Sequence, residues 1–133
     1  MAGEVQRSVD DQGMSDKVHL LGFLTHKKVD QILEQANLNV IASKDEGFGL
    51  SIIEGYSHGV PTVTFSDLDA VPDLFDNQAM VKVEGRSDDE LATGIEEGLN
   101  KQWDRSWIRE YAKSFSIAKM AEQYIKVYSQ SLN

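Results

Sequence analysis

Short apolar runs alternate with amphipathic stretches along most of the chain. Four runs have the length of strands and are bounded by polar residues or glycine, at residues 18–21, 38–42, 62–65 and 80–83. Between the first two runs, residues 29–36 place apolar side chains at the spacing of one helix face. After the second run, a helix is predicted from about Leu50, and Gly59 is suited to close it. A shorter helix or turn is expected at residues 71–75.

The last third of the chain shows helical patterns with clear starting residues. Ser87 and Glu90 have the spacing of a capping box, which opens a helix that contains two glycines. Asp104 is suited to cap a further helix, with aromatic residues on one of its faces, and Ser116 to cap a last one that runs to about residue 128. The aromatic face has helical spacing, which favours packing in a core over a sugar-binding platform.

Strand patterns that alternate with helix patterns predict βαβ units. The expected fold is α/β: a Rossmann-like parallel sheet of about four strands with flanking helices. Residues 1–16 are polar and are interpreted as a tail, with at most a short helix, or as the stub of a missing unit. Residues 17–133 are interpreted as the domain itself.

Composition narrows the classes of function. The chain has 133 residues, no cysteine and a formal net charge of −9. Its length is that of one domain, and the lack of cysteine excludes a disulfide scaffold, thiolate catalysis and Cys-ligated zinc. The negative charge argues against non-specific nucleic-acid binding. No apolar run reaches the ~20 residues that span a bilayer, and the first residues do not resemble a secretory signal.

The loop after the second strand carries the candidate chemistry, because ligands of such folds bind where strands lead into helices. Residues 43–54 read SKDEGFGLSIIE. A helix that begins near Gly49 offers backbone N–H groups to a phosphate, and Gly47 and Gly49 allow a ligand to approach the backbone. The carboxylates of Glu46 and Glu54 are suited to accept hydrogen bonds from sugar hydroxyls. These features suggest a nucleotide-sugar pocket, but an ordinary glycine-containing strand-to-helix turn has the same pattern.

Four segments resemble a known family, and they occur in the family's order. Residues 18–23 (VHLLGF) resemble its V-x-x-x-G strand, residues 42–50 (ASKDEGFGL) its P-S-x-x-E-G-F-G-L motif, and residues 53–63 (IEGYSHGVPTV) its x-E-A-M-A-x-G-x-P-V-V motif. Phe115 and Ser116, followed by the last predicted helix, resemble its closing segment. The family is that of the retaining glycosyltransferases of group 1 (family 4, GT-B fold), and the resemblance covers about residues 18–128.

The resemblance implies a role for each matching residue. Glu46 would contact the hydroxyls of the donor sugar in the active site, and Glu54 would hold the ribose hydroxyls. The other donor-binding residues that it implies are Gly22, Phe23, Ser43, Gly47, Phe48, Gly49 and Leu50. The implied reaction transfers a sugar from a nucleotide diphosphate sugar to an acceptor with retention at the anomeric carbon. It needs no metal and no cofactor, and the scattered histidines of the sequence do not suggest a metal site.

Two departures from the family limit this expectation. The family's domain begins with two further βα units, and the first carries a basic pair that neutralises the donor diphosphate; neither unit is present. The acceptor-binding half that precedes them is also missing. We therefore expect the donor-binding part of a glycosyltransferase that is inactive as this isolated chain. The alternative is a non-catalytic module that binds a nucleotide sugar or docks a partner.

The missing strands would leave residues 18–21 and 38–42 without a neighbour between them. The gap is expected either to close locally or to be filled by pairing between two chains, since exposed strand edges favour association. The expected partners are thus a nucleotide-sugar donor, the upstream acceptor domain and a second copy of the chain. The expected location is the cytoplasm, with attachment to a membrane surface through the missing half as a second option.

Overall fold

The computed structural model describes residues 2–42 and 49–115. Its centre is a parallel sheet of three strands in the order β1 (Asn39–Ile41), β2 (Thr62–Phe65) and β3 (Met80–Val83). Val63 of β2 lies opposite both Val40 of β1 and Val81 of β3. The predictions of these three strands from their apolar runs are therefore confirmed. The chain has the α/β fold class that the alternation of strand and helix patterns indicated.

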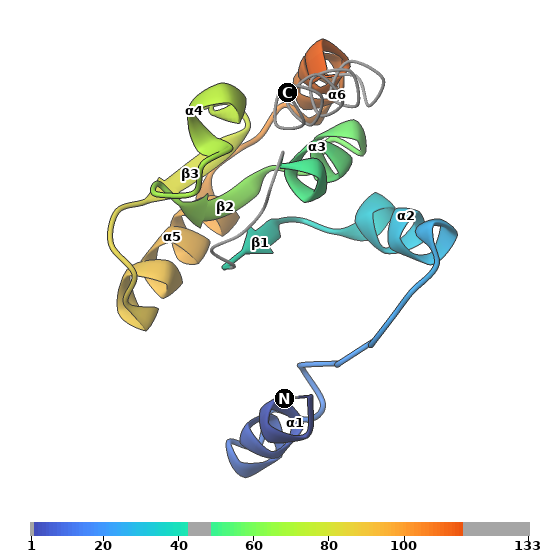
Figure 1. Cartoon of the computed structure of the whole chain (residues 1–133), viewed down its shortest axis with the longest axis vertical. Helices are drawn as coiled ribbons and strands as arrows, with labels where there is room; N and C mark the ends of the chain where they lie inside the picture. The colour runs from blue at the N-terminus through green and yellow to red at the C-terminus, as the bar shows by residue number, and fades with distance from the viewer. Residues whose placement is uncertain (1, 43–48, 116–133) are drawn as a thin grey trace, which may run out of the picture.

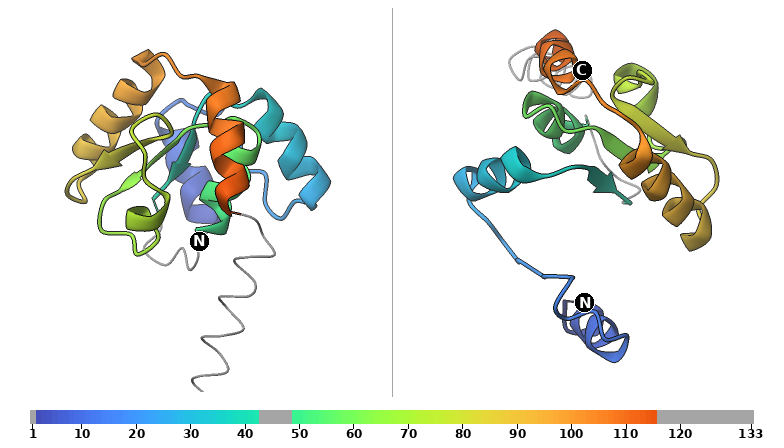
Figure 2. Two further views of the ribbon diagram at one scale, coloured as in Figure 1. Left: turned by 90° about the horizontal axis from the view of Figure 1, so that it is seen from above. Right: turned by 180° about the vertical axis from the view of Figure 1, so that it is seen from behind.

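Helices cover both faces of this sheet (Figure 1). The helices are α1 (Ala2–Asp11), α2 (His26–Gln35), α3 (Leu50–Ser57), α4 (Val71–Leu74), α5 (Asp88–Asn100) and α6 (Arg105–Ala112), and a 3₁₀ turn, η1 (Lys113–Phe115), follows α6. The helices α3 and α6 pack together on one face, and α5 packs against β2 and β3 on the other, as Figures 1 and 2 show. None of the helices in the described part of the chain is long and apolar enough to cross a membrane.

Two apolar clusters hold these layers together. The larger cluster joins the sheet to α3, α4 and α6 and contains Tyr56 and Ile108, both completely buried. The smaller cluster lies between the sheet and α5, and its strand residues are Val63, Phe65, Val81 and Val83. These residues alternate along β2 and β3, as expected for side chains that point to one face of a sheet.

The two glycines of α5 mark the places where this helix lies closest to its neighbours. A Cβ atom on Gly94 would lie 2.5 Å from Cγ2 of Val83, and one on Gly98 would lie 3.0 Å from Cγ2 of Val63. A larger side chain at either position would push α5 away from the sheet. The glycines cost helix propensity, about 1 kcal/mol each relative to alanine, but they permit this close packing.

The predicted helix caps are present. The Oγ atom of Ser87 accepts a hydrogen bond from the backbone N–H of Glu90 at 3.1 Å, and Oδ1 of Asp104 accepts one from the N–H of Trp107 at 3.0 Å. On the aromatic face of α6, the rings of Trp107 and Tyr111 stack with centroids 4.9 Å apart and lie against the larger cluster. The prediction that this face packs in a core is confirmed.

The prediction of a strand at residues 18–21 is wrong. The segment between α1 and α2 is irregular, and Val18, Leu20 and Leu21 are all exposed. A strand needs a neighbour for its backbone hydrogen bonds, and within the described residues none lies beside this segment. Residues 18–21 do not pair with β1, so the gap does not close locally, and β1 forms an edge of the sheet.

The two ends of the chain complete the description. Residues 2–11 form α1, which Figure 1 shows apart from the sheet, at the end of the extended segment that leads to α2. The helix predicted to start at Ser116 lies outside the described residues.

Candidate functional site

Gly49 fixes the start of α3 at the edge of the sheet where the candidate loop ends. It caps the helix with φ = +71°, a left-handed conformation that favours glycine. A Cβ atom at this position would lie 2.3 Å from Cδ1 of Leu74 and 2.9 Å from Cβ of Ala70. The backbone conformation and the close approach of α4 therefore both require glycine here.

A cavity of about 770 Å³ lies beside α3. Its walls come from three helices and η1: Leu50, Ile53, Glu54 and Ser57 of α3, His26 and Asp30 of α2, and Arg109, Glu110, Ala112, Lys113 and Phe115 of α6 and η1. The volume lies in the range of small-molecule sites, which are typically ~300–1,000 Å³ and mostly apolar with a few polar groups. Two of the predicted donor-binding residues, Leu50 and Glu54, line this cavity together.

Glu54 contributes a carboxylate to the lining of the cavity. It is half-buried on the second turn of α3, one turn after Leu50. Within the described part of the chain its carboxylate has no hydrogen-bond or ion-pair partner. An ionised carboxylate is an acceptor at both oxygens, so it can bind two vicinal hydroxyl groups at once. The position predicted for the ribose contact therefore has suitable chemistry.

Cationic residues that no sequence motif indicated also line the cavity. Arg109 and Lys113 lie four residues apart along α6 and η1, and both line the cavity. Lys113 is engaged with Glu110 through a contact of 2.8 Å between Nζ and Oε1. Each of the two cations directly follows an apolar residue of α6 that is buried, Ile108 or Ala112. This repeat after four residues was the only local sign that both cations lie on the same side of the helix. Their proximity to Glu54 depends on how α6 packs against α3, which the local sequence does not reveal.

The other described candidates lie outside this cavity. Gly22 adopts φ = +66° in the irregular segment before α2, and the side chain of Phe23 is fully exposed. Neither residue is among those that line the cavity, and their predicted role in donor binding stays a prediction. Ser43, Glu46, Gly47 and Phe48 lie outside the described residues, and their roles stay predictions.

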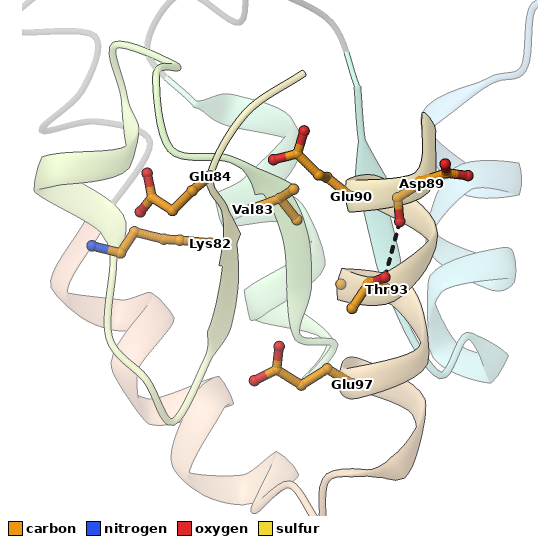
Figure 3. A pocket seen from close by; sticks show the side chains of 8 residues that line it. Lys82, Val83, Glu84, Asp89, Glu90, Thr93 and Glu97 are labelled. Atoms are coloured by element: carbon orange, nitrogen blue, oxygen red, sulfur yellow. Dashed lines mark hydrogen bonds between the residues drawn. The ribbon is translucent and has the colours of Figure 1, made fainter. Parts of the chain in front are cut away.

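A second hollow, between β3 and α5, is a poor candidate for a phosphate ligand. Its volume is about 340 Å³, and four carboxylates line it, those of Glu84, Asp89, Glu90 and Glu97 (Figure 3). Lys82 is its single cationic lining residue. Acidic groups would repel a diphosphate, and none of the predicted donor-binding residues is present. The described residues also contain no cluster of three or more histidine, aspartate and glutamate side chains that could hold a metal ion.

Comparison with known proteins gives a consistent result. The family model described as "Glycosyl transferases group 1" matches residues 2–115. The GPI3 subunit of phosphatidylinositol N-acetylglucosaminyltransferase from Saccharomyces cerevisiae is 24% identical over 131 residues, which are 95% of this chain and 29% of that protein. Mannosylfructose-phosphate synthase from Agrobacterium fabrum is 33% identical over 60 residues, which are 45% of this chain and 13% of the relative.

A solved structure shows the same fold. The catalytic domain of starch synthase IV from Arabidopsis thaliana, bound to ADP and acarbose, superposes with a TM-score of 0.63 and 21% identity. The match covers 96% of this chain and 29% of the starch synthase chain. The chain thus has the fold of part of a GT-B domain, and it spans less than a third of the length of the relatives that it matches over most of its residues.

Proposed function

The chain belongs to the glycosyl transferases group 1 family, and we propose that it is the donor-binding part of a retaining glycosyltransferase. The complete enzyme would transfer a sugar from a nucleotide diphosphate sugar to an acceptor. The observation that carries the proposal is the carboxylate of Glu54, which lines a cavity of about 770 Å³ and has no partner within the described residues. This group is the one that the family's motif assigns to the ribose hydroxyls.

The family's motif also implies donor-binding roles for residues near Glu54 in the sequence. Glu46 would contact the hydroxyls of the transferred sugar, and the backbone of Phe48, Gly49 and Leu50 would contact the sugar or the phosphates. Ser43 and Gly47 belong to the same loop. The starch synthase that shares this fold was determined with ADP, and a nucleoside diphosphate is the part common to all donors of the proposed class.

The remaining parts of the proposed enzyme would lie upstream of this chain. A diphosphate leaving group needs positive charge in the transition state, and the family's basic pair belongs to βα units that would lie beside β1. The outer edge of β1 pairs with no strand in the described part of the chain, so it can accept such a unit or a second copy of this chain. We expect the isolated chain to bind a donor without transferring its sugar, and we expect the protein in the cytoplasm.

An assay of the full-length protein tests this function. Release of ADP, UDP or GDP from the matching sugar donors in the presence of acceptor extracts is expected, together with incorporation of the sugar. Glu46→Gln should abolish transfer, while Glu96→Gln, on the exposed face of α5, should not. Nucleotide binding without any transfer by the full-length protein would instead favour a non-catalytic binding module.

A further inference from the structure

His58, at the end of α3, lies between two carboxylates of α2. Its Nδ1 atom is 2.5 Å from Oε1 of Glu34, and its Nε2 atom is 3.1 Å from Oδ1 of Asp30. Asp30 and Glu34 are four residues apart, so they project from the same face of α2. The imidazole is only 16% exposed, whereas the two carboxylates are more than half exposed. A single side chain at the C-terminal end of α3 therefore contacts two consecutive turns of α2.

This contact is important for α2 because, within the described residues, the helix packs only lightly against the other helices and strands. No residue of α2 is buried. A second polar link lies at its end, where Nη2 of Arg105 donates a hydrogen bond to the carbonyl oxygen of Ala36 at 3.1 Å. The helix nevertheless supplies His26 and Asp30 to the wall of the cavity that contains Glu54. A shift of α2 relative to α3 would therefore change the width of that cavity.

The charged groups around His58 come from three helices. Asp30 and Glu34 of α2 contact the imidazole directly, and Glu54 lies one turn earlier on α3. From α6, Arg105 donates hydrogen bonds to the carbonyl oxygens of His58 and Gly59, and Arg109 lies beside Gly59. Burial by itself lowers the pKa of His58, but the hydrogen bonds to Glu34 and Asp30 outweigh it, and the pKa is raised above its ordinary value of 6.5.

We propose that His58 is a positioning residue, which in its protonated form holds α2 against α3 and thereby sets the width of the cavity in which Glu54 lies. The effect on ligand binding rests on the donor-binding function proposed above. An imidazolium ion has two N–H donors, one for each carboxylate, whereas a neutral imidazole has one. After the proton is lost, the imidazole can donate a hydrogen bond to only one of the two carboxylates, so one turn of α2 is released.

The direction of the pH dependence follows from the raised pKa. The contact stabilises the docked position of α2 fully at pH values below the ordinary pKa of His58. This stabilisation is lost as the pH rises through the raised pKa of the folded protein. A lysine at position 58 keeps its charge throughout this range, so His58→Lys should make the position of α2 independent of pH.

Distance measurements on the free chain test the positioning role. The chain has no cysteine, so Gln31→Cys on α2 and Glu96→Cys on α5 provide two unique sites for spin labels. With His58 present, the distance distribution should be narrow at about pH 6 and broader at about pH 9. With His58→Lys it should stay narrow at both pH values, and with His58→Ala it should be broad at both. Identical distributions for all three proteins, or no change with pH in the parent, would overturn the proposal.

Calorimetric titrations with ADP, UDP and GDP at the same two pH values test the link to the cavity. Between the lower and the higher pH, the affinity of the parent should fall about threefold to tenfold more than the affinity of the His58→Lys variant. The comparison with this variant removes the contribution of the nucleotide's own titration. Equal pH profiles for the two proteins would contradict the link. Binding of no nucleotide at either pH would contradict the proposed function, while the distance measurements would still decide whether His58 positions α2.

Discussion

The carbonyl oxygen of Ala42 accepts a hydrogen bond from Nη1 of Arg86 at 3.4 Å, although 44 residues separate the two positions. Ala42 follows β1, and Arg86 lies in the segment between β3 and α5. The same guanidinium donates two hydrogen bonds to the carboxylate of Asp67, just beyond β2, and lies 4.3 Å from the centre of the Phe65 ring. Arg86 therefore connects the carboxyl ends of all three strands at the edge where the candidate donor loop begins.

Arg86→Gln should lower the free energy of unfolding, because it removes the hydrogen bonds to Asp67 and to the carbonyl oxygen of Ala42. The pair with Asp67 is partly exposed, which limits its contribution, but the bidentate geometry and the bond to Ala42 add to it. Urea denaturation followed by circular dichroism provides the measurement. Arg7→Gln, on the exposed surface of α1, is the matched control and should leave stability unchanged; equal effects of the two substitutions would show that Arg86 does not connect the strands.

Two tyrosines share one buried acceptor. The hydroxyl groups of Tyr56 and Tyr111 both donate hydrogen bonds to the carbonyl oxygen of Leu74, at 3.1 and 3.2 Å. Burial raises the pKa of both tyrosines, most strongly that of Tyr56, so both stay protonated and able to donate at neutral pH.

Replacing either tyrosine by phenylalanine leaves the Leu74 carbonyl with one donor. Tyr56→Phe and Tyr111→Phe should each cost about 1 kcal/mol, and the double variant should cost more than the sum of the two. The excess arises because only the double variant leaves a buried carbonyl without either donor. Thermal and urea unfolding of the parent, the two single variants and the double variant measure this excess. Strictly additive effects would argue against a shared acceptor.

Gly49→Ala should destabilise the fold by about 2 kcal/mol or more. The substitution places a Cβ atom in a left-handed backbone conformation and against Leu74 and Ala70. Gly3→Ala in α1 is the control, because nothing lies within 4 Å of the added atom. The control should be neutral or slightly stabilising, as alanine favours a helix. A Gly49→Ala variant with an unchanged melting temperature would mean that α3 does not start as described.

The fold was predictable from the sequence where the determinants are local. Thr62–Phe65 is an apolar run after a proline, and Ser87 and Asp104 cap helices through bonds to residues three positions away. Residues 18–21 have the same local pattern as a strand, yet they are not in the sheet, because pairing depends on a neighbouring strand that the pattern does not include. Gly94 and Gly98 are unfavourable in a helix by local propensity, and only the packing of α5 against the sheet shows why glycine suits these positions.

The candidate site was predictable to the same extent. The motif around Glu54 pointed to α3, and the structure places Leu50 and Glu54 together in the lining of one cavity, while their roles in donor binding stay predictions. Arg109, Lys113 and His58 could not be found in this way, since their contribution depends on how α2 and α6 pack against α3. His58 and Glu34 are 24 residues apart, and no local spacing connects them.

The most direct test of the central claim, that the Glu54 cavity is a donor site, is a calorimetric titration of the chain with ADP, UDP and GDP. We predict binding of at least one of them, and about a tenfold to hundredfold loss of affinity in Glu54→Ala, because hydrogen bonds to a charged group contribute about 1.5–3 kcal/mol. Glu96→Ala, an exposed substitution on α5, should bind like the parent. Binding that is unaffected by Glu54→Ala, or no heat with any of the three nucleotides, would contradict the account.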